Sequence, residues 1–240
     1  MLSFSRTACF NTNNAFATLV LNLLHHHETI NNLLPLAMST SMMKFSWRLL
    51  KRCQQPTTTQ PVLQRRLLSI PSAGASGFEK VGVIGLGLMG HGICQVAAAA
   101  GAHSSHSVVA YEPDEKFLNS GKDRIAGSLE KLVSKGKISQ DDADKTMGSI
   151  QFTTDMSDLK DMDLIVEAVV EKMDLKKDIY TNLGQICEEK TIFASNTSGL
   201  SITEMAAFSG RTDRFLGVHF FNPVQIMKLV EGKDIIWVIL

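Results

Sequence analysis

Apolar positions in this chain of 240 residues form short runs that alternate with stretches of helical spacing, beginning near Phe78. Val81–Ile84 is a continuous apolar run that stops at glycines, as a buried strand does before a turn. Apolar residues then recur at helical spacing from about Leu88 to Gly101, and residues 107–111 form a second, β-branched run. The pattern predicts a strand, a glycine turn, a helix and a second strand.

The same alternation continues to residue 219. A long charged helix is predicted from Asp114 to Lys135, and Ser139 with Asp142 resembles a capping box for another helix. A further helix is predicted over 173–187, with an inner side that carries Leu175, Ile179, Leu183 and Ile186. Strands are predicted at 150–152, 163–169, 191–195 and 215–219. This alternation implies an α/β fold of the Rossmann type, a doubly wound, mostly parallel sheet with flanking helices.

The turn after the first strand has the glycine spacing of a phosphate-binding loop, Gly85-Leu86-Gly87-Leu88-Met89-Gly90. Gly85 would permit the tight turn, Gly87 would let the backbone approach a pyrophosphate, and Gly90 would let the helix pack closely. Free amides and the positive end of the helix dipole would stabilise an anion there. Leu88 and Met89 are expected to line the cofactor site within this loop. By itself, the motif fits a plain turn as well.

Glu112 ends the second strand about 20 residues after the last glycine, where a ribose-binding carboxylate is expected. A carboxylate accepts hydrogen bonds from a 2′-hydroxyl but repels a 2′-phosphate, and Pro113 follows it instead of an arginine. Strand, loop, helix, strand and acid in this order predict a dinucleotide site. The cofactor favoured by the acid is NAD, not NADP.

Charge divides the chain near Phe78. The first 78 residues hold seven basic residues and one acid, Glu28, whereas the remainder holds 17 basic and 23 acidic residues. A basic, Ser/Thr-rich and nearly acid-free segment is typical of organelle transit peptides, and residues 43–52 can place their cations on one helix face. We therefore expect residues 1–77 to be a transit peptide or disordered leader for the mitochondrial matrix. The alternatives are a plastid or cytoplasmic location, or initiation at Met38, Met42 or Met43.

Several classes of partner are disfavoured. The apolar patch at 15–24 is shorter than the roughly 20 residues that a membrane-spanning helix requires, so no membrane span is predicted. No nucleic-acid partner is predicted. Consecutive histidines at 25–27 cannot all face one ion, so no metal site is expected. The cysteines show no CxxC spacing and fit a reducing compartment, with Cys94 and Cys187 as small buried residues.

Polar side chains follow three of the predicted strands, at 167–171, 195–198 and 219–222. The carboxyl ends of parallel strands meet at one edge of a sheet, so these side chains should converge. Among them, His219 is suited to proton transfer at neutral pH, because the reference pKa of histidine is near 6.5. Standing alone, it would be read as a core histidine.

The chain resembles the short-chain L-3-hydroxyacyl-CoA (3-hydroxybutyryl-CoA) dehydrogenases in five segments. They are the glycine loop, Glu167–Glu171, Ser195–Ser198, His219–Pro223 and Met227–Glu231. The likeness runs from about residue 80 to residue 231. It implies an NAD-dependent oxidoreductase that oxidises L-3-hydroxyacyl-CoA to 3-ketoacyl-CoA in fatty-acid β-oxidation.

The resemblance also implies roles for single residues. His219 would be the general base and Glu231 would orient its ring, while Ser198 and Asn222 would hold the substrate oxygen. The NAD site would be lined by Glu171, Lys176, Ser198 and Asn222. Coenzyme A would contact Ser128 and Lys135, although a lysine at a helix end also stabilises the helix dipole without any ligand.

The sequence departs from the family pattern in two places. Residues 101–107 make a longer link than the family's, and residues 232–240 do not continue its pattern. We therefore expect an NAD-binding domain at 78–231 and an aberrant tail at 232–240. The family's helical carboxyl-terminal domain, which forms its homodimer interface, is expected to be missing.

Two alternatives stay open. One is a truncated NAD-binding protein with little or no turnover of acyl-CoA. The other is a β-hydroxyacid dehydrogenase of the 6-phosphogluconate type, which shares the style of the glycine loop but uses a lysine on a later helix. His219–Pro223 argues against that second alternative.

Overall fold

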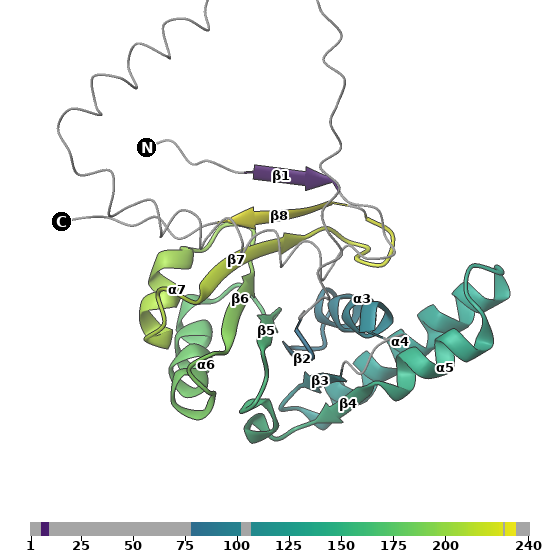
Figure 1. Cartoon of the computed structure of the whole chain (residues 1–240), viewed down its shortest axis with the longest axis horizontal. Coiled ribbons are helices and arrows are strands. Elements are labelled where there is room, and N and C mark those ends of the chain that lie inside the picture. Colours follow the sequence, from purple (N-terminus) through teal and green to yellow (C-terminus); the bar gives the residue numbers. More distant parts are fainter. Residues whose placement is uncertain (1–5, 10–77, 102–106, 228, 234–240) are drawn as a thin grey trace, which may run out of the picture. The chain divides into compact units, whose positions relative to one another are not determined.

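The structure is a computed structural model that describes residues 6–9, 78–101, 107–227 and 229–233 (Figure 1). Several expectations fall on other residues: the remainder of the predicted leader, with its cationic segment 43–52, most of the long link at 102–106, and the tail from residue 234. These expectations lie outside the described residues.

One mixed sheet organises the described part of the chain, with the strand order β1-β8-β7-β6-β5-β2-β3-β4 (Figure 1). Neighbours from β7 to β4 in this order pair in parallel, and β8 and β1 are added antiparallel. The strands are β1 Arg6–Cys9, β2 Lys80–Ile84, β3 Ser107–Tyr111, β4 Ile150–Thr153, β5 Leu164–Glu167, β6 Ile192–Asn196, β7 Phe215–Phe220 and β8 Leu229–Lys233.

From residue 78 onward, the chain enters this sheet in the middle. From β2 it winds outward through β3 and β4, then returns to the other side of β2 and winds outward through β5, β6 and β7. The winding therefore reverses between β2 and β5. The predicted doubly wound, mostly parallel sheet is confirmed, and ligands of such sheets bind at the carboxyl ends of the strands beside this reversal.

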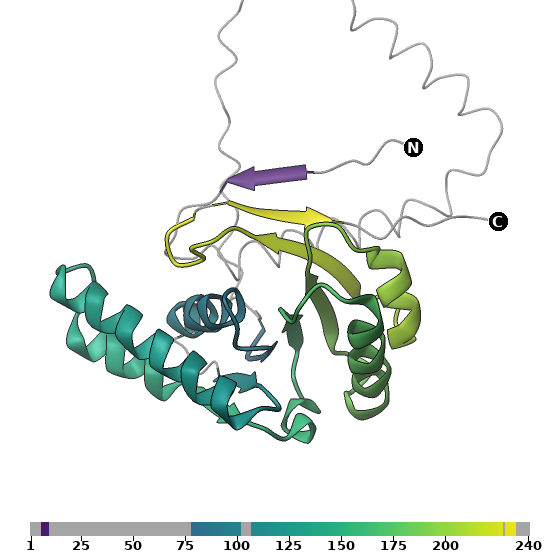
Figure 2. The same cartoon turned by 180° about the vertical axis from the view of Figure 1, so that it is seen from behind.

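Helices cover both sides of the sheet, as Figures 1 and 2 show: α3, α4 and α5 lie on one side, and α6 and α7 on the other. Asp114 caps α4 by accepting the amides of Lys116 and Phe117, and Ser139 with Asp142 forms the predicted capping box of α5. The elements are α3 Gly90–Gly101, α4 Glu115–Ser134, α5 Gln140–Gly148, the 3-10 turn η3 Met156–Leu159, α6 Met173–Ile186 and α7 Ile202–Ser209.

The buried face of α6 differs from the predicted one. Leu175 is 39% exposed and Ile186 is 38% exposed, so their prediction as inner residues is wrong. The packed face instead centres on Ile179, Leu183 and two polar side chains that apolar spacing overlooked, Lys176 and Tyr180. The ring of Tyr180 packs edge to face on Phe215, with ring centroids 4.7 Å apart.

Four elements were absent from the expected set, the 3-10 turn η3 among them. The helix α7 is short, although Ser201 caps it and Ile202, Met205 and Ala206 are buried. Strand β8 follows β7 antiparallel and continues past residue 231 to Lys233. Strand β1 lies within the predicted leader, where no strand was expected, and pairs with β8.

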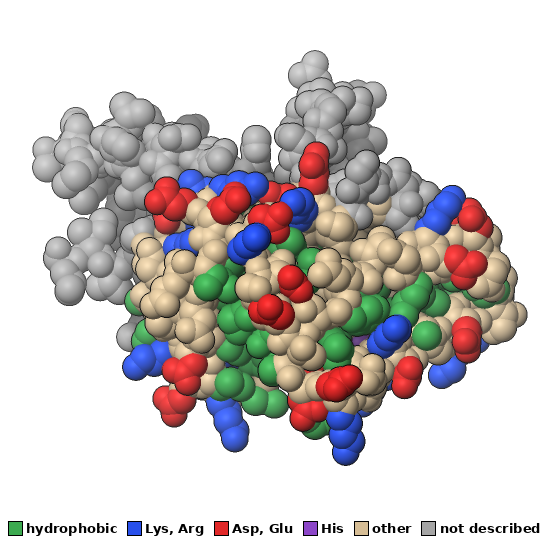
Figure 3. Space-filling view, turned by 90° about the horizontal axis from the view of Figure 1, so that it is seen from below, with side chains coloured by type: hydrophobic (Ala, Val, Ile, Leu, Met, Phe, Trp, Pro, Cys, Tyr) green, Lys and Arg blue, Asp and Glu red, His purple; other side chains and the backbone are tan. Residues whose placement is uncertain are grey.

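Charge on the described surface is mixed. Figure 3 shows acidic and basic side chains spread mainly around the outline of one face, with apolar surface between them. Such interspersed charge differs from the single-sign patch that nucleic-acid binding favours. Among the residues that the structure describes, no helix is both long and apolar enough to cross a bilayer.

The two glycines within α4 allow a direct test of how tightly that helix is packed. A Cβ placed on Gly121 would lie 2.6 Å from the Cβ of Leu86 in the glycine loop, whereas a Cβ on Gly127 would meet nothing within 4 Å. Gly121→Ala should therefore lower the free energy of unfolding by about 1–3 kcal/mol. Gly127→Ala should raise it by up to about 1 kcal/mol, because alanine favours helix. Urea unfolding of both variants measures this, and equal effects would contradict the close contact.

Candidate active site

The glycine loop presents bare backbone at the carboxyl end of β2. Gly85 has a φ of +87°, which favours glycine, and its amide donates to the Tyr111 carbonyl at 2.9 Å. A Cβ on Gly90 would overlap the Gly85 carbonyl oxygen, so only glycine lets α3 begin this close to the strand. Gly87 is exposed and faces open space within 4 Å. The loop therefore fits a diphosphate at the amino end of a helix.

Glu112 lies against this loop. It directly follows β3, and β3 pairs in register with β2, which brings the two strand ends together. Its Oε2 accepts a hydrogen bond from the Leu86 amide at 3.1 Å, and the residue is half-buried. A carboxylate beside the loop is placed to accept hydrogen bonds from a ribose hydroxyl.

The loops after β5 and β6 are tied together by Glu171. Its Oε1 accepts the Ser198 amide at 2.6 Å and the Thr197 hydroxyl at 2.9 Å, and the Ser198 hydroxyl lies 3.0 Å from both carboxylate oxygens. These donors, the Ser198 amide first, lower the pKa of the Glu171 carboxyl below its ordinary value of 4.5. Glu171 is therefore held as a carboxylate at the sheet edge.

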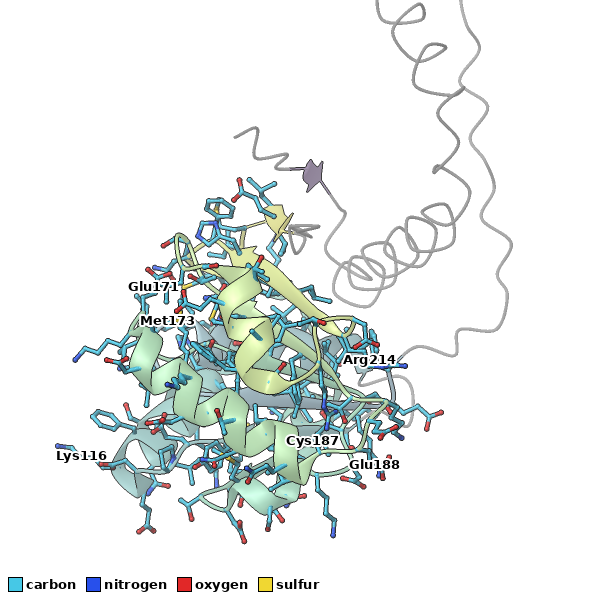
Figure 4. The ribbon with its side chains drawn as sticks, turned by 90° about the vertical axis from the view of Figure 1, so that its left-hand side faces the viewer. Lys116, Glu171, Met173, Cys187, Glu188 and Arg214 are labelled. Carbon is cyan, nitrogen blue, oxygen red and sulfur yellow. The ribbon has the colours of Figure 1, made fainter. Side chains whose placement is uncertain are left out.

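Figure 4 shows which end of the sheet this is. Glu171 lies beside Met173, at the start of α6, whereas Cys187, Glu188 and Arg214 lie at the other end of that helix. Because β2, β5 and β6 run in the same direction, the Glu171 cluster and the glycine loop lie at the same, carboxyl edge of the sheet.

His219 and Glu231 face each other across an antiparallel strand pair. They are directly opposite in the register of β7 and β8, and the His219 Nδ1 lies 3.0 Å from the Glu231 Oε2. Their side chains are 23% and 25% exposed, so both reach solvent from a largely enclosed position. The ring of Phe221 packs beside the imidazole, with centroids 4.6 Å apart. The geometry is that of a histidine oriented by a carboxylate.

Asn222 follows β7 as an exposed residue, joined to Pro223 by a cis peptide bond. The next residues are fixed on α3: Val224 fills the notch at Gly92, where a Cβ would lie 2.9 Å from the valine Cβ. The Gln225 side chain donates to the Gln95 side chain at 3.1 Å. The connection from β7 to β8 is thus docked on the helix of the glycine loop.

Asn196 has a role that sequence reasoning missed. Its side-chain oxygen accepts the Phe220 amide at 3.0 Å, which ties the end of β6 to the end of β7. The signal was present, because Asn196 stands between Ser195 and Thr197 at a strand end and amides there bond to neighbouring backbone. The docking of Val224 and Gln225 on α3 had no comparable signal in the sequence.

The remaining predicted site residues lie on α6, on α4 and on the glycine loop. Lys176 is 0% exposed, and its ammonium donates to both oxygens of Glu167 at 2.7 Å, so it is enclosed beneath the sheet edge instead of lining it. Ser128 is half-buried on α4, and Lys135 is the exposed residue that ends that helix. Leu88 is 63% exposed on the glycine loop, next to the half-buried Met89.

A family model described as "3-hydroxyacyl-CoA dehydrogenase, NAD binding domain" matches residues 80–233. The match includes β8 to its last residue. It therefore extends two residues beyond the point at which the resemblance was expected to end.

Curated relatives agree with this match. The chain is 49% identical over 152 residues to a probable 3-hydroxybutyryl-CoA dehydrogenase of Deinococcus radiodurans, covering 63% of this chain and 53% of the relative. It is 44% identical over 179 residues to the mitochondrial hydroxyacyl-coenzyme A dehydrogenase of Sus scrofa, covering 70% and 56%. The chain spans about half the length of the curated relatives it matches.

Solved structures show the same likeness. The crystal structure of (S)-3-hydroxybutyryl-CoA dehydrogenase from Ralstonia eutropha superposes with a TM-score of 0.60 at 39% identity, covering 64% of this chain and 53% of the other. The crystal structure of FadB2 from M. tuberculosis gives a TM-score of 0.60 at 41% identity, covering 62% and 52%.

The lowered pKa of Glu171 predicts a pH-dependent contribution to stability. A carboxyl whose pKa is depressed by folding stabilises the fold above its unfolded pKa, and this stabilisation is lost as pH falls through the folded pKa. Glu171→Gln should therefore unfold at lower urea than the parent at pH 7, and the gap should close as pH falls below about 4.5. Glu130→Gln, at an exposed position on α4, controls for loss of charge alone. A gap that is constant with pH would contradict the prediction.

Proposed function

Because the chain belongs to the 3-hydroxyacyl-CoA dehydrogenase family, of which it carries the NAD-binding domain, we propose that it oxidises L-3-hydroxyacyl-CoA to 3-ketoacyl-CoA. The observation that carries this proposal is the His219–Glu231 pair, with 3.0 Å between Nδ1 and Oε2. The pair lies on β7 and β8, whose connection is docked on the helix of the glycine loop. The base and the cofactor cradle, by which we mean the glycine loop Gly85–Gly90, therefore share one framework.

The pair would orient the imidazole. With the Glu231 oxygen as acceptor, the His219 Nδ1 would donate the hydrogen bond between them, and Nε2 would be the ring nitrogen left to accept a proton. Nε2 can then take the proton of a substrate hydroxyl. The Glu231 charge stabilises the imidazolium that results, in the same way as the aspartate of a hydrolase triad.

The neighbouring polar groups orient the substrate. Ser198 and Asn222 would hold the oxygen that loses its proton, since both are exposed and follow adjacent strands. Glu171 holds the Ser198 hydroxyl in place from behind. When bound, NAD supplies the acceptor for the hydride that leaves the carbon bearing this substrate oxygen.

Residues of the glycine loop and of the neighbouring loops would bind the successive parts of NAD. The backbone from Gly85 to Gly90, including Leu88 and Met89, would hold the diphosphate, and Glu112 would accept the hydroxyls of the adenosine ribose. Glu171, Ser198 and Asn222 would lie toward the nicotinamide end. The Glu112 charge favours NAD because it would repel the 2′-phosphate of NADP.

We assign the binding of the coenzyme A part of the substrate to α4. Lys135 is an exposed cation at the end of that helix, and Ser128 lies two turns before it. An ammonium there would attract a phosphate of coenzyme A, and the serine hydroxyl would donate to it. These two residues keep the roles that the resemblance implied.

A setting in mitochondrial fatty-acid β-oxidation is part of the proposal. The basic, nearly acid-free residues 1–77 support it, as do mitochondrial relatives at 44% identity. Relatives from bacteria, such as Deinococcus radiodurans, have names of the same activity class. Import of the full chain into isolated mitochondria would test the location.

Removing the base should separate binding from turnover. His219→Gln should lower the rate of NADH oxidation with acetoacetyl-CoA by about 10²–10⁴-fold, because no group then carries the proton. The dissociation constant of NADH, measured by fluorescence, should change less than about twofold, because His219 lies outside the cradle. Glu231→Gln should lower turnover less, and Glu130→Gln should leave it unchanged. Loss of NADH binding in His219→Gln would mean that the histidine is structural.

Removing the Glu112 charge should weaken discrimination between cofactors. Glu112→Gln keeps an oxygen to accept the Leu86 amide but no longer repels a 2′-phosphate. We expect the ratio of NADPH to NADH dissociation constants to fall by about tenfold. Glu115→Gln, an exposed change in the first turn of α4, is the matched control. An unchanged ratio would refute the assignment of Glu112 to the ribose.

A further inference from the structure

His91 lies in the first turn of α3 and bonds back to the glycine loop. Its ring nitrogen Nδ1 is 2.8 Å from the Gly87 carbonyl oxygen, and its backbone amide donates to the same oxygen at 3.4 Å. With a carbonyl oxygen as acceptor, Nδ1 would be the donor of the shorter bond. The side chain of His91 therefore makes the closer of its two contacts with the loop.

Gly87 is the part of the glycine loop that this bond holds. The residues before it have partners at the end of β3: the Gly85 amide donates to the last carbonyl of that strand, and the Leu86 amide donates to Glu112. Gly87 itself is exposed, and a Cβ on it would meet nothing within 4 Å. In the described part of the chain, His91 is the residue that hydrogen-bonds to this tip of the loop.

The direction of the Gly87 carbonyl decides where the next amide points. In a trans peptide, the carbonyl and the following N–H point in opposite directions. Because the carbonyl points toward His91, the Leu88 amide points away from it. Leu88 is 63% exposed, so this amide belongs to an accessible part of the loop. An amide held in a fixed direction at the amino end of a helix is a donor for an anion.

We propose that His91 is a positioning residue for the diphosphate of the dinucleotide. Its Nδ1–H holds the Gly87 carbonyl toward α3 and so aims the Leu88 amide at the diphosphate. This inference rests on the proposed function, because it takes NAD as the ligand of the glycine loop. His91 acts through the backbone of residues 87 and 88, without touching the reacting atoms. The glycine pattern itself ends at Gly90 and does not specify the residue that follows.

A second bond in the chain shows what the same contact does within a helix. The Thr146 hydroxyl donates to the carbonyl of Asp142, four residues before it, at 2.7 Å. Both of these residues belong to α5, whereas the bond of His91 crosses from α3 into the loop before it. Thr146→Val removes such a bond with little change of shape and leaves the glycine loop untouched. It is therefore the matched control for a purely structural role.

Asparagine and glutamine at position 91 separate the two ring nitrogens. The side-chain amide nitrogen of asparagine takes the place of Nδ1, and that of glutamine takes the place of Nε2. In the full chain, His91→Ala and His91→Gln should raise the dissociation constant of NADH, measured by fluorescence, by about three- to tenfold. His91→Asn should keep it within about twofold of the parent, because the donor to Gly87 is restored. Equal values for the asparagine and glutamine variants would contradict the proposal.

ADP-ribose locates the effect on the ligand, since it carries the same diphosphate without the nicotinamide. The loss of affinity in His91→Ala should be as large for ADP-ribose as for NADH, because it arises at the diphosphate. Thr146→Val should change neither dissociation constant by more than about twofold. If Thr146→Val weakens NADH binding as much as His91→Ala does, or if ADP-ribose binds the parent and His91→Ala equally, the proposal fails.

A spectrum of the histidine rings tests the bond without any cofactor. Nitrogen NMR of the cofactor-free parent with labelled histidine should show the neutral His91 ring with its proton on Nδ1, because the bond to Gly87 sets the tautomer. The signal is assigned by its loss in His91→Gln. A proton on Nε2 instead would overturn the proposal. A parent chain that does not bind NADH would refute the proposed function, while this spectrum would still decide whether His91 holds the loop.

Discussion

The approach of α3 to the end of β2 is the constraint on which the site depends. There is no room for a side chain between residue 90 and the Gly85 carbonyl. Because residue 90 is glycine, the helix can start immediately after the turn. Its amino end is then brought to the edge where the winding of the sheet reverses. The loop after β5 packs closely on this turn, since Val169 and Ala168 contact Gly85. The shape of the glycine loop therefore depends on the lack of side chains at Gly85 and Gly90 as well as on the residues that pack against it.

Local pattern was sufficient to predict most of the framework. The apolar runs that became β2 and β3, and the capping box at Ser139, act within a few residues and are readable from spacing. Strand β8 was missed because three of its five residues are polar or glycine, and its pairing is decided by β7. Leu175 was misplaced because apolar spacing alone cannot show that Lys176 occupies the packed side of α6.

The site was only partly predictable, for a related reason. Glu112 could be placed from spacing, since one strand and one helix separate it from the glycine loop. The contact of His219 with Glu231 depended on a resemblance, because nothing local indicates which carboxylate meets the histidine. The burial of Lys176 was not readable, because its partners Glu167 and Ser195 come from two strands that only the folded sheet brings together.

The opposition of His219 and Glu231 across β7 and β8 makes the chemistry of the site a matter of strand register. A shift of β8 by one residue would put Val230 or Gly232 opposite the histidine and turn the carboxylate to the other face of the sheet. Strand β8 is held on both sides, since β1 pairs with it in register as well. A misregistered hairpin would leave a folded protein with an intact cofactor cradle and a histidine that nothing orients.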